Sequence, residues 1–127
     1  MKIFILEDNP DRMIAFKSIL KDHTIIHAID VKEAKEKFDK NRPFDSILLD
    51  HDLGGEIYVD SDFWNTGYQF VRFLTTYRSE DIKNTQIIIH TQNPVGAENM
   101  LQLFIQENIQ AKVIPFPILI NQIKIME

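Results

Sequence analysis

The sequence predicts an α/β fold: a single doubly wound sheet of five parallel strands in the flavodoxin-like order 2-1-3-4-5. Two observations support this prediction. Short β-rich runs alternate with longer segments whose apolar residues recur at helical spacing, which indicates right-handed βαβ units. The third and fourth runs are apolar nearly throughout, as expected for strands that helices cover on both faces. A chain of 127 residues suits one such domain, and residues 1–127 are expected to form it.

Five segments have the length and the composition of strands. Ile, Val and Leu are frequent in them, and most of them end at polar or turn-forming residues. The expected strands are residues 2–6, 23–28, 46–49, 86–90 and 111–114.

A helical pattern follows each expected strand. Pro10 suits the first turn of the first helix, with Asp8 or Asn9 as its cap. Asp30 is expected to cap the second helix, which Pro43 stops, and the third begins near Thr66. The apolar positions of the first four helices are Met13, Ile14, Phe16, Ile19 and Leu20; Val31, Ala34 and Phe38; Tyr68, Val71, Phe73, Leu74 and Tyr77; and Met100, Leu101, Phe104 and Ile105. Residues 118–126 are expected to form a last helix, although their pattern also tolerates an extended conformation.

Composition excludes several classes of function. The chain has no cysteine, which excludes disulfides, zinc thiolate sites and thiol catalysis. Its formal net charge of −5 argues against bulk nucleic-acid binding through the phosphate backbone. No apolar run is long enough for a signal peptide or a membrane span, so we expect a cytoplasmic protein with no membrane partner.

Polar side chains follow the first, third and fourth expected strands. Parallel strands bring their carboxyl ends to one edge of the sheet, so these side chains are expected to converge there. Four clustered carboxylates need a cation or protons to relieve their repulsion, and hard oxygen ligands favour Mg²⁺ or Mn²⁺. The residues are Glu7 and Asp8, then Asp50, His51 and Asp52, and then His90, Thr91 and Asn93.

Several of these residues also have a structural interpretation. A single carboxylate at a strand end is often a helix cap or a solvated turn residue, although convergence from three strands favours a site. His51 and His90 suit acid–base chemistry or metal binding, or they are neutral side chains that backbone carbonyls satisfy. Gly96, at a helix start, either lets amides approach a phosphate or belongs to a plain capped helix.

Residues 51–65 show no convincing helical or strand pattern. A loop of this length inside a compact domain is usually functional or mobile, and this one has the length to close over a ligand. Phe63 and Trp64 either pack the loop down or stack on a base, and burial is the more common use of such side chains.

These motifs resemble a receiver domain of the response-regulator type over nearly the whole chain. Glu7 and Asp8 match the acidic pair that binds Mg²⁺ in receivers. Asp50 matches the aspartate that accepts the phosphoryl group, and Thr91 matches the switch Ser/Thr after the fourth strand. Ile114 departs from the pattern, because receivers carry at this point a lysine that contacts the phosphoryl group.

A second departure is Asp52, which adds a carboxylate where receivers use mainly a backbone carbonyl. LDHDLGG, the TGY step and HTQNPVGAENM are more similar to a receiver-derived family, the cyclic-phosphate-processing receiver domain. That resemblance implies enzymatic handling of cyclic phosphates, with a link to RNA or nucleotide processing in biological conflict. It places the site at Asp8, Asp50, His51, Asp52, His90, Thr91 and Asn93.

The residues and the resemblance together predict a metal-dependent phosphoesterase acting on a cyclic phosphate, either a nucleotide or an RNA end. The expected metal ligands are Glu7, Asp8, Asp50 and Asp52; the catalytic residues are Asp50, His51, Asp52 and His90; and the phosphate contacts are Thr91, Asn93 and Gly96. Either water or Asp50 is the nucleophile. Two rival functions stay open: a single-domain response regulator phosphorylated on Asp50, and a degenerate receiver that only binds a protein partner.

Overall fold

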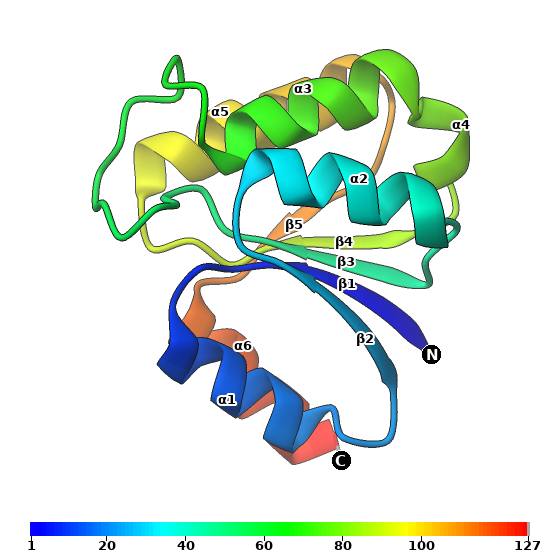
Figure 1. Ribbon diagram of the computed structural model, residues 1–127, viewed down its shortest axis with the longest axis vertical. Helices are drawn as coiled ribbons and strands as arrows, with labels where there is room; N and C mark the ends of the chain where they lie inside the picture. Colours follow the sequence, from blue (N-terminus) through cyan, green and yellow to red (C-terminus); the bar gives the residue numbers. More distant parts are fainter. Residues whose placement is uncertain (127) are drawn as a thin grey trace.

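The computed structural model describes residues 1–126 and has a five-stranded parallel sheet in the order β2-β1-β3-β4-β5 (Figure 1). This is the order that the sequence predicts, and every neighbouring pair of strands is parallel. The elements in chain order are β1 (Lys2–Leu6), α1 (Pro10–Ile19), β2 (Thr24–Ala28), α2 (Val31–Asn41), β3 (Ser46–Leu49), α3 (Gly67–Tyr77), α4 (Ser79–Ile82), β4 (Gln86–Ile89), α5 (Pro94–Gln106), β5 (Lys112–Val113) and α6 (Phe116–Met126).

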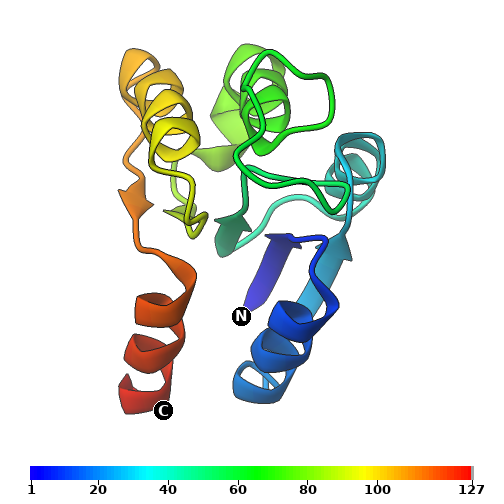
Figure 2. The same cartoon turned by 90° about the vertical axis from the view of Figure 1, so that its left-hand side faces the viewer.

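Helices cover both faces of the sheet (Figure 2). Helices α1 and α6 pack on one face, and α2, α3 and α5 pack on the other. Side chains of the central strands alternate between the two cores, so that Leu49 lies in the α2–α3–α5 core and Leu48 in the α1–α6 core. By the same alternation, Asp50, the first residue after β3, turns toward the α1–α6 face.

Four phenylalanine rings form the centre of the core beneath α2 and α3. The ring of Phe4 lies 5.2 Å from Phe44 and 5.4 Å from Phe70, and Phe38 stacks on Phe44 at 5.5 Å. Rings at these separations add to the free energy gained by burying their area. These rings therefore pack β1, the strand that the acidic pair follows, against α2 and α3.

Side-chain caps fix the helices that start at the carboxyl edge of the sheet. Asn9 Oδ1 accepts hydrogen bonds from the N–H groups of Asp11 and Arg12, so it is Asn9 that caps α1. Thr66 caps α3 and Asn93 caps α5 in the same way. Because Asn9 caps α1, the carboxylate of Asp8 is left to make another contact.

The differences from the sequence prediction lie at the ends of elements. Strands β2, β4 and β5 are each shorter than predicted, by one or two residues. The final segment is helical, as predicted, and begins at Phe116. Helix α4 was missed because four residues are too few to show a helical period. Within residues 1–126 no helix is long and apolar enough to cross a membrane.

Candidate functional site

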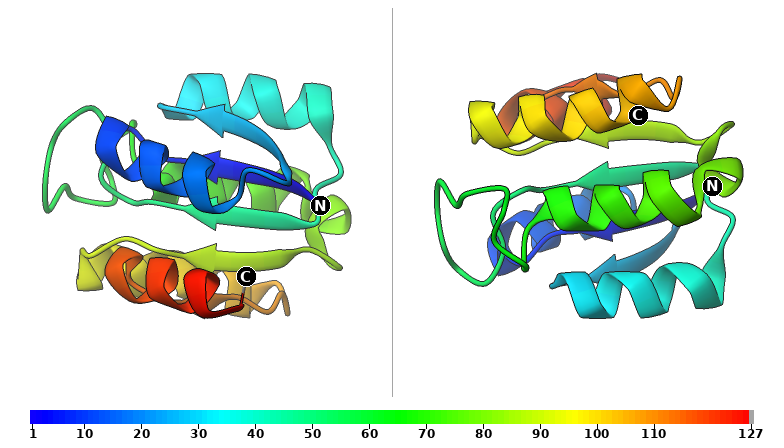
Figure 3. Two further views of the ribbon diagram at one scale, coloured as in Figure 1. Left: turned by 90° about the horizontal axis from the view of Figure 1, so that it is seen from below. Right: turned by 90° about the horizontal axis from the view of Figure 1, so that it is seen from above.

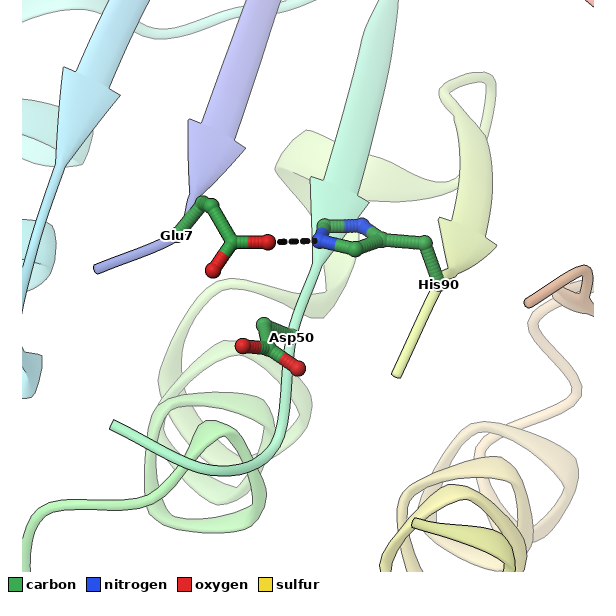
Figure 4. Close-up of side chains that lie close together, drawn as sticks. All are labelled: Glu7, Asp50 and His90. Carbon is green, nitrogen blue, oxygen red and sulfur yellow. Dashed lines mark hydrogen bonds and ion pairs between the residues drawn. The ribbon is translucent and has the colours of Figure 1, made fainter. Parts of the chain in front are cut away.

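Glu7, Asp50 and His90 meet at the carboxyl edge of the sheet, from the ends of β1, β3 and β4 (Figure 4). One ligand atom of each lies within 4.8 Å of the others, and all three side chains are buried. His90 Nε2 lies 3.0 Å from Glu7 Oε1. Three strand ends therefore bring two carboxyl groups and an imidazole into one buried cluster.

Backbone hydrogen bonds that continue the sheet set the positions of these residues. The N–H of Glu7 donates to the carbonyl of Ala28 at 3.0 Å, and the N–H of Asp50 donates to the carbonyl of Leu6 at 3.0 Å. The N–H of His90 donates to the carbonyl of Leu49 at 2.9 Å. The cluster is thus fixed by strand register rather than by a flexible loop.

Burial shifts the protonation of all three groups. Desolvation, followed by the negative charge of Glu7, raises the pKa of Asp50 from 3.8 to about 7. Desolvation also raises the pKa of Glu7, and it lowers the pKa of His90 from 6.5 to about 4. Near neutral pH the protein alone therefore keeps His90 uncharged and holds a proton on the carboxyl pair for much of the time.

This donor set fits a divalent cation. Carboxylate oxygens suit Mg²⁺ and Mn²⁺, and a neutral imidazole is a good ligand for Mn²⁺ and other transition metals. The ring nitrogen of His90 that faces Glu7 is Nε2, so Nε2 is the nitrogen placed to join the two carboxyl groups in holding a cation (Figure 4). A cation would replace the proton that the carboxyl pair holds.

A cavity of about 380 Å³ lies beside the cluster. Glu7 and Asp50 line it, whereas His90 lies behind them. Its wall also contains Asp8, Arg12, Asp52, Thr91, Gln92 and Asn93, together with Ile57 and Tyr58 of the long loop. Of the residues predicted from sequence, the structure thus brings Glu7, Asp8, Asp50, Asp52, Thr91 and Asn93 to one cavity.

The loop between β3 and α3 projects beyond the carboxyl edge of the sheet (Figure 3). Two carboxylates hold it: Asp8 Oδ2 accepts from Gly55 N–H at 2.6 Å, and Asp52 Oδ2 accepts from Tyr58 N–H at 2.8 Å. Tyr58 has a left-handed backbone with φ of 51°, which is uncommon for a residue with a side chain. Ile57 and Tyr58 are 78% and 72% exposed at the cavity. The loop therefore places two exposed, largely apolar side chains at the cavity.

Asp52 anchors this loop. Burial alone would raise the pKa of Asp52, but hydrogen bonds from His51, Asn93 and the N–H groups of Tyr58 and Val59 outweigh burial and lower it. Its Oδ1 lies 2.7 Å from His51 Nδ1 and 3.0 Å from Asn93 Nδ2. Asp52 is therefore ionised near neutral pH, with donors from the protein on both oxygens.

His51 is buried and does not line the cavity. Its Nε2 lies 2.8 Å from Ser61 Oγ, so the ring joins Asp52 to the far part of the loop. Gly96 packs against the ring so closely that a Cβ at this position would lie 2.4 Å from His51 Cγ. His51 therefore packs between the loop and the start of α5.

Thr91, Asn93 and Gly96 form the start of α5. Thr91 Oγ1 accepts from Asn93 N–H at 3.2 Å, and both residues line the cavity. Asn93 Oδ1 accepts from Gly96 N–H at 3.0 Å. The amide of Gly96 is thus used in the cap, which is the plain-helix alternative that the sequence left open.

Comparison with known protein families identifies a family for this chain. The sequence profile of the cyclic-phosphate processing receiver domain matches residues 1–106. The chain belongs to this family. No curated protein gives a significant match to the sequence.

Solved structures similar to this receiver domain include response regulators. A CheY-like receiver domain from Methanospirillum hungatei superposes with a TM-score of 0.65 at 18% identity, covering 98% of this chain and 91% of the other. The Mn²⁺-bound form of response regulator Rcp1 gives 0.67 at 16% identity, covering 99% and 91%. The Mg²⁺-BeF complex of response regulator TrrA from Thermotoga maritima gives 0.64 at 17% identity, covering 99% and 98%. The likeness shows that the fold is that of a receiver.

One basic residue at the site of this receiver domain was missed by the sequence analysis. Arg12 Nη1 lies 3.6 Å from Glu7 Oε1 and 3.9 Å from Asp50 Oδ2. Its position in the first turn of α1, just after the acidic pair, is the available signal, but the strand-end argument covers only residues that directly follow a strand. Ile114, at the expected lysine position, packs in the α1–α6 core. Among the described residues, Arg12 of α1 thus places a basic group beside the cluster.

Proposed function

We propose that this receiver domain is a divalent-metal-dependent phosphoesterase that processes a cyclic phosphate, of a nucleotide or an RNA end. The observation that carries the proposal is the buried cluster of Glu7, Asp50 and His90 beside the 380 Å³ cavity. Family membership points to cyclic phosphates. Two receivers of similar structure, one bound to Mn²⁺ and one in complex with Mg²⁺-BeF, add support for a cation.

Glu7, Asp50 and His90 would hold the cation, with Asp8 beside them in the cavity wall. The cation would neutralise phosphate charge and lower the pKa of a bound water. Because His90 is uncharged near neutral pH, its ring offers a lone pair without first losing a proton. We therefore propose His90 as a metal ligand, one of the two chemical roles predicted for it from sequence.

Asp50 is the residue proposed to act in the reaction. Once a cation has displaced its proton, the carboxylate of Asp50, at the cavity wall, can accept a proton from the attacking water as a general base. The same carboxylate can instead attack phosphorus: an acyl phosphate forms as one ester P–O bond of the ring breaks, the leaving oxygen takes a proton from water, and hydrolysis of the acyl phosphate restores Asp50. Thr91 and Asn93, in the cavity wall, would orient the phosphate oxygens.

His51 and Asp52 are proposed as positioning residues. They hold the loop of Ile57 and Tyr58 against the cavity through the hydrogen bonds to Ser61 and to Tyr58 N–H. A loop held there would exclude water from the reacting phosphate. Their loss would therefore act on substrate binding and on loop order rather than on metal binding.

The test is hydrolysis of a panel of 2′,3′-cyclic and 3′,5′-cyclic nucleotides, with Mn²⁺ or Mg²⁺ and with chelator. We expect turnover of at least one substrate that requires both the metal and Asp50, and that Asp50→Asn abolishes. Asp22→Asn, in the exposed turn before β2, is the matched control and should keep wild-type turnover. Turnover that persists in chelator or in Asp50→Asn would overturn the proposal.

A phosphorylated switch is the second candidate, because Asp50 lies at the end of β3 and lines the cavity as an acceptor would. Incubation with acetyl phosphate and Mg²⁺, followed by intact-mass measurement, distinguishes the two. A stable gain of one phosphoryl group on Asp50, without turnover of any cyclic phosphate, would support the switch.

A further inference from the structure

Arg12 is the only Lys or Arg among the described residues that line the cavity. The carboxyl groups of five residues line the same cavity: Glu7, Asp8, Asp50, Asp52 and Glu56. A phosphate that enters therefore meets strong repulsion unless cations offset it. A bound metal would supply part of that charge, and Arg12 is the residue placed to supply the rest.

Two contacts with uncharged side chains orient the guanidinium of Arg12. Its Nη2 donates to Gln92 Oε1 at 2.7 Å, and its central carbon lies 5.2 Å from the centre of the Phe116 ring. Gln92 follows β4, and Phe116 is fixed to the same strand end because its N–H donates to the carbonyl of His90 at 2.9 Å. Two uncharged side chains therefore help to orient Arg12.

The distances to the acids are too long for hydrogen bonds. Arg12 Nη1 lies 3.6 Å from Glu7 Oε1 and 3.9 Å from Asp50 Oδ2, whereas a charged N–H···O bond is about 2.7–2.9 Å long. Arg–carboxylate pairs often form two parallel N–H···O bonds, and at these distances Arg12 forms none with Glu7 or Asp50. Nη1 instead keeps donor capacity at the cavity wall, with the side chain 24% exposed.

We propose that Arg12 binds the substrate, donating from Nη1 to a non-bridging oxygen of the phosphate, with Gln92 and Phe116 as positioning residues. This inference rests on the proposed function of the same cavity. The planar guanidinium presents its N–H donors in a geometry that suits phosphate oxygens. Arg12 would thus supply from α1 the phosphate-binding cation that the usual receiver lysine supplies after the last strand, where this chain has Ile114.

The experiment measures phosphate and metal binding separately, so it needs no turnover. Inorganic phosphate is titrated by ³¹P NMR with saturating Mg²⁺, and Mn²⁺ binding is measured by calorimetry. The proteins are the wild type, Arg12→Gln, Arg12→Lys, and Lys17→Gln as a control for charge loss on the exposed face of α1. Circular dichroism confirms that each variant is folded.

We expect Arg12→Gln to weaken phosphate binding about 10- to 100-fold, the loss typical of a charge-assisted hydrogen bond. Mn²⁺ binding should stay equal or become tighter, because a positive charge leaves the neighbourhood of the ligands. Arg12→Lys should recover part of the phosphate affinity, and Lys17→Gln should match the wild type. Unchanged phosphate binding in Arg12→Gln, or parallel loss of phosphate and Mn²⁺ binding, would overturn the inference and leave Arg12 a counter-ion. Failure of cyclic-nucleotide hydrolysis would refute only the proposed reaction.

Discussion

Replacing Asp50 by Asn should stabilise the metal-free protein, and by more at high pH than at low pH. The fold raises the pKa of Asp50 from 3.8 to about 7, so it favours the protonated carboxyl group. The contribution of that group to stability is complete below pH 3.8 and is lost as the pH rises through about 7. Three pKa units correspond to about 4 kcal/mol in all, of which about 2 kcal/mol is lost between about pH 5.5 and about pH 8. Asn is isosteric, and it does not ionise.

The assay is urea unfolding of the wild type and Asp50→Asn in chelator at these two pH values, with Asp22→Asn as the control for loss of one negative charge. The stability difference between Asp50→Asn and wild type should grow by about 2 kcal/mol toward the higher pH. Saturating Mn²⁺ should reverse the order, since a ligand stabilises only the protein that binds it. A difference that does not change with pH would refute the claim that Asp50 is buried next to Glu7 with a raised pKa.

Four further outcomes are expected. Mn²⁺ affinity should fall about tenfold per pH unit below about pH 7, because the metal must displace the proton of Asp50; calorimetry that finds no pH dependence would contradict this. Gly96→Ala should lower the free energy of unfolding by about 1–3 kcal/mol, because its Cβ would overlap the His51 ring, and wild-type stability would rule out that packing. His51→Ala should speed amide hydrogen exchange in residues 54–65 and leave Mn²⁺ binding intact; slow exchange in this loop would show that His51 does not anchor it. Phe70→Ala should lower stability by about 3–5 kcal/mol in urea, and a loss below 1 kcal/mol would contradict its place among the packed rings.

The fold was predictable because the sequence signals for it are local. Apolar strands alternate with capped helices, and the handedness of βαβ units leaves few ways to arrange them. The carboxyl edge of the sheet then had to hold the polar residues that follow each strand. Glu7, Asp50 and His90 could be brought together on this argument alone, without knowledge of any distance.

The roles within the site were harder to predict, because side-chain direction after a strand depends on the loop that follows. His51 and Asp50 are neighbours in sequence, yet Asp50 lines the cavity and the ring of His51 packs against Gly96 in the first turn of α5. Arg12 reaches the cluster from a helix and is held by Gln92 and Phe116, which are distant in sequence. No pattern of spacing relates these three residues, so only the folded chain reveals them.

A cation held by Glu7, Asp50 and His90 is what the proposed reaction requires first, and Mn²⁺ binding followed by electron paramagnetic resonance tests this directly. The wild type should bind one Mn²⁺ per chain. Glu7→Gln, Asp50→Asn and His90→Gln should each weaken that binding strongly, while Asp22→Asn should leave it unchanged. Wild-type Mn²⁺ binding in all three cluster variants, or no Mn²⁺ binding by the wild type at about pH 8, where Asp50 is mostly ionised, would contradict the account.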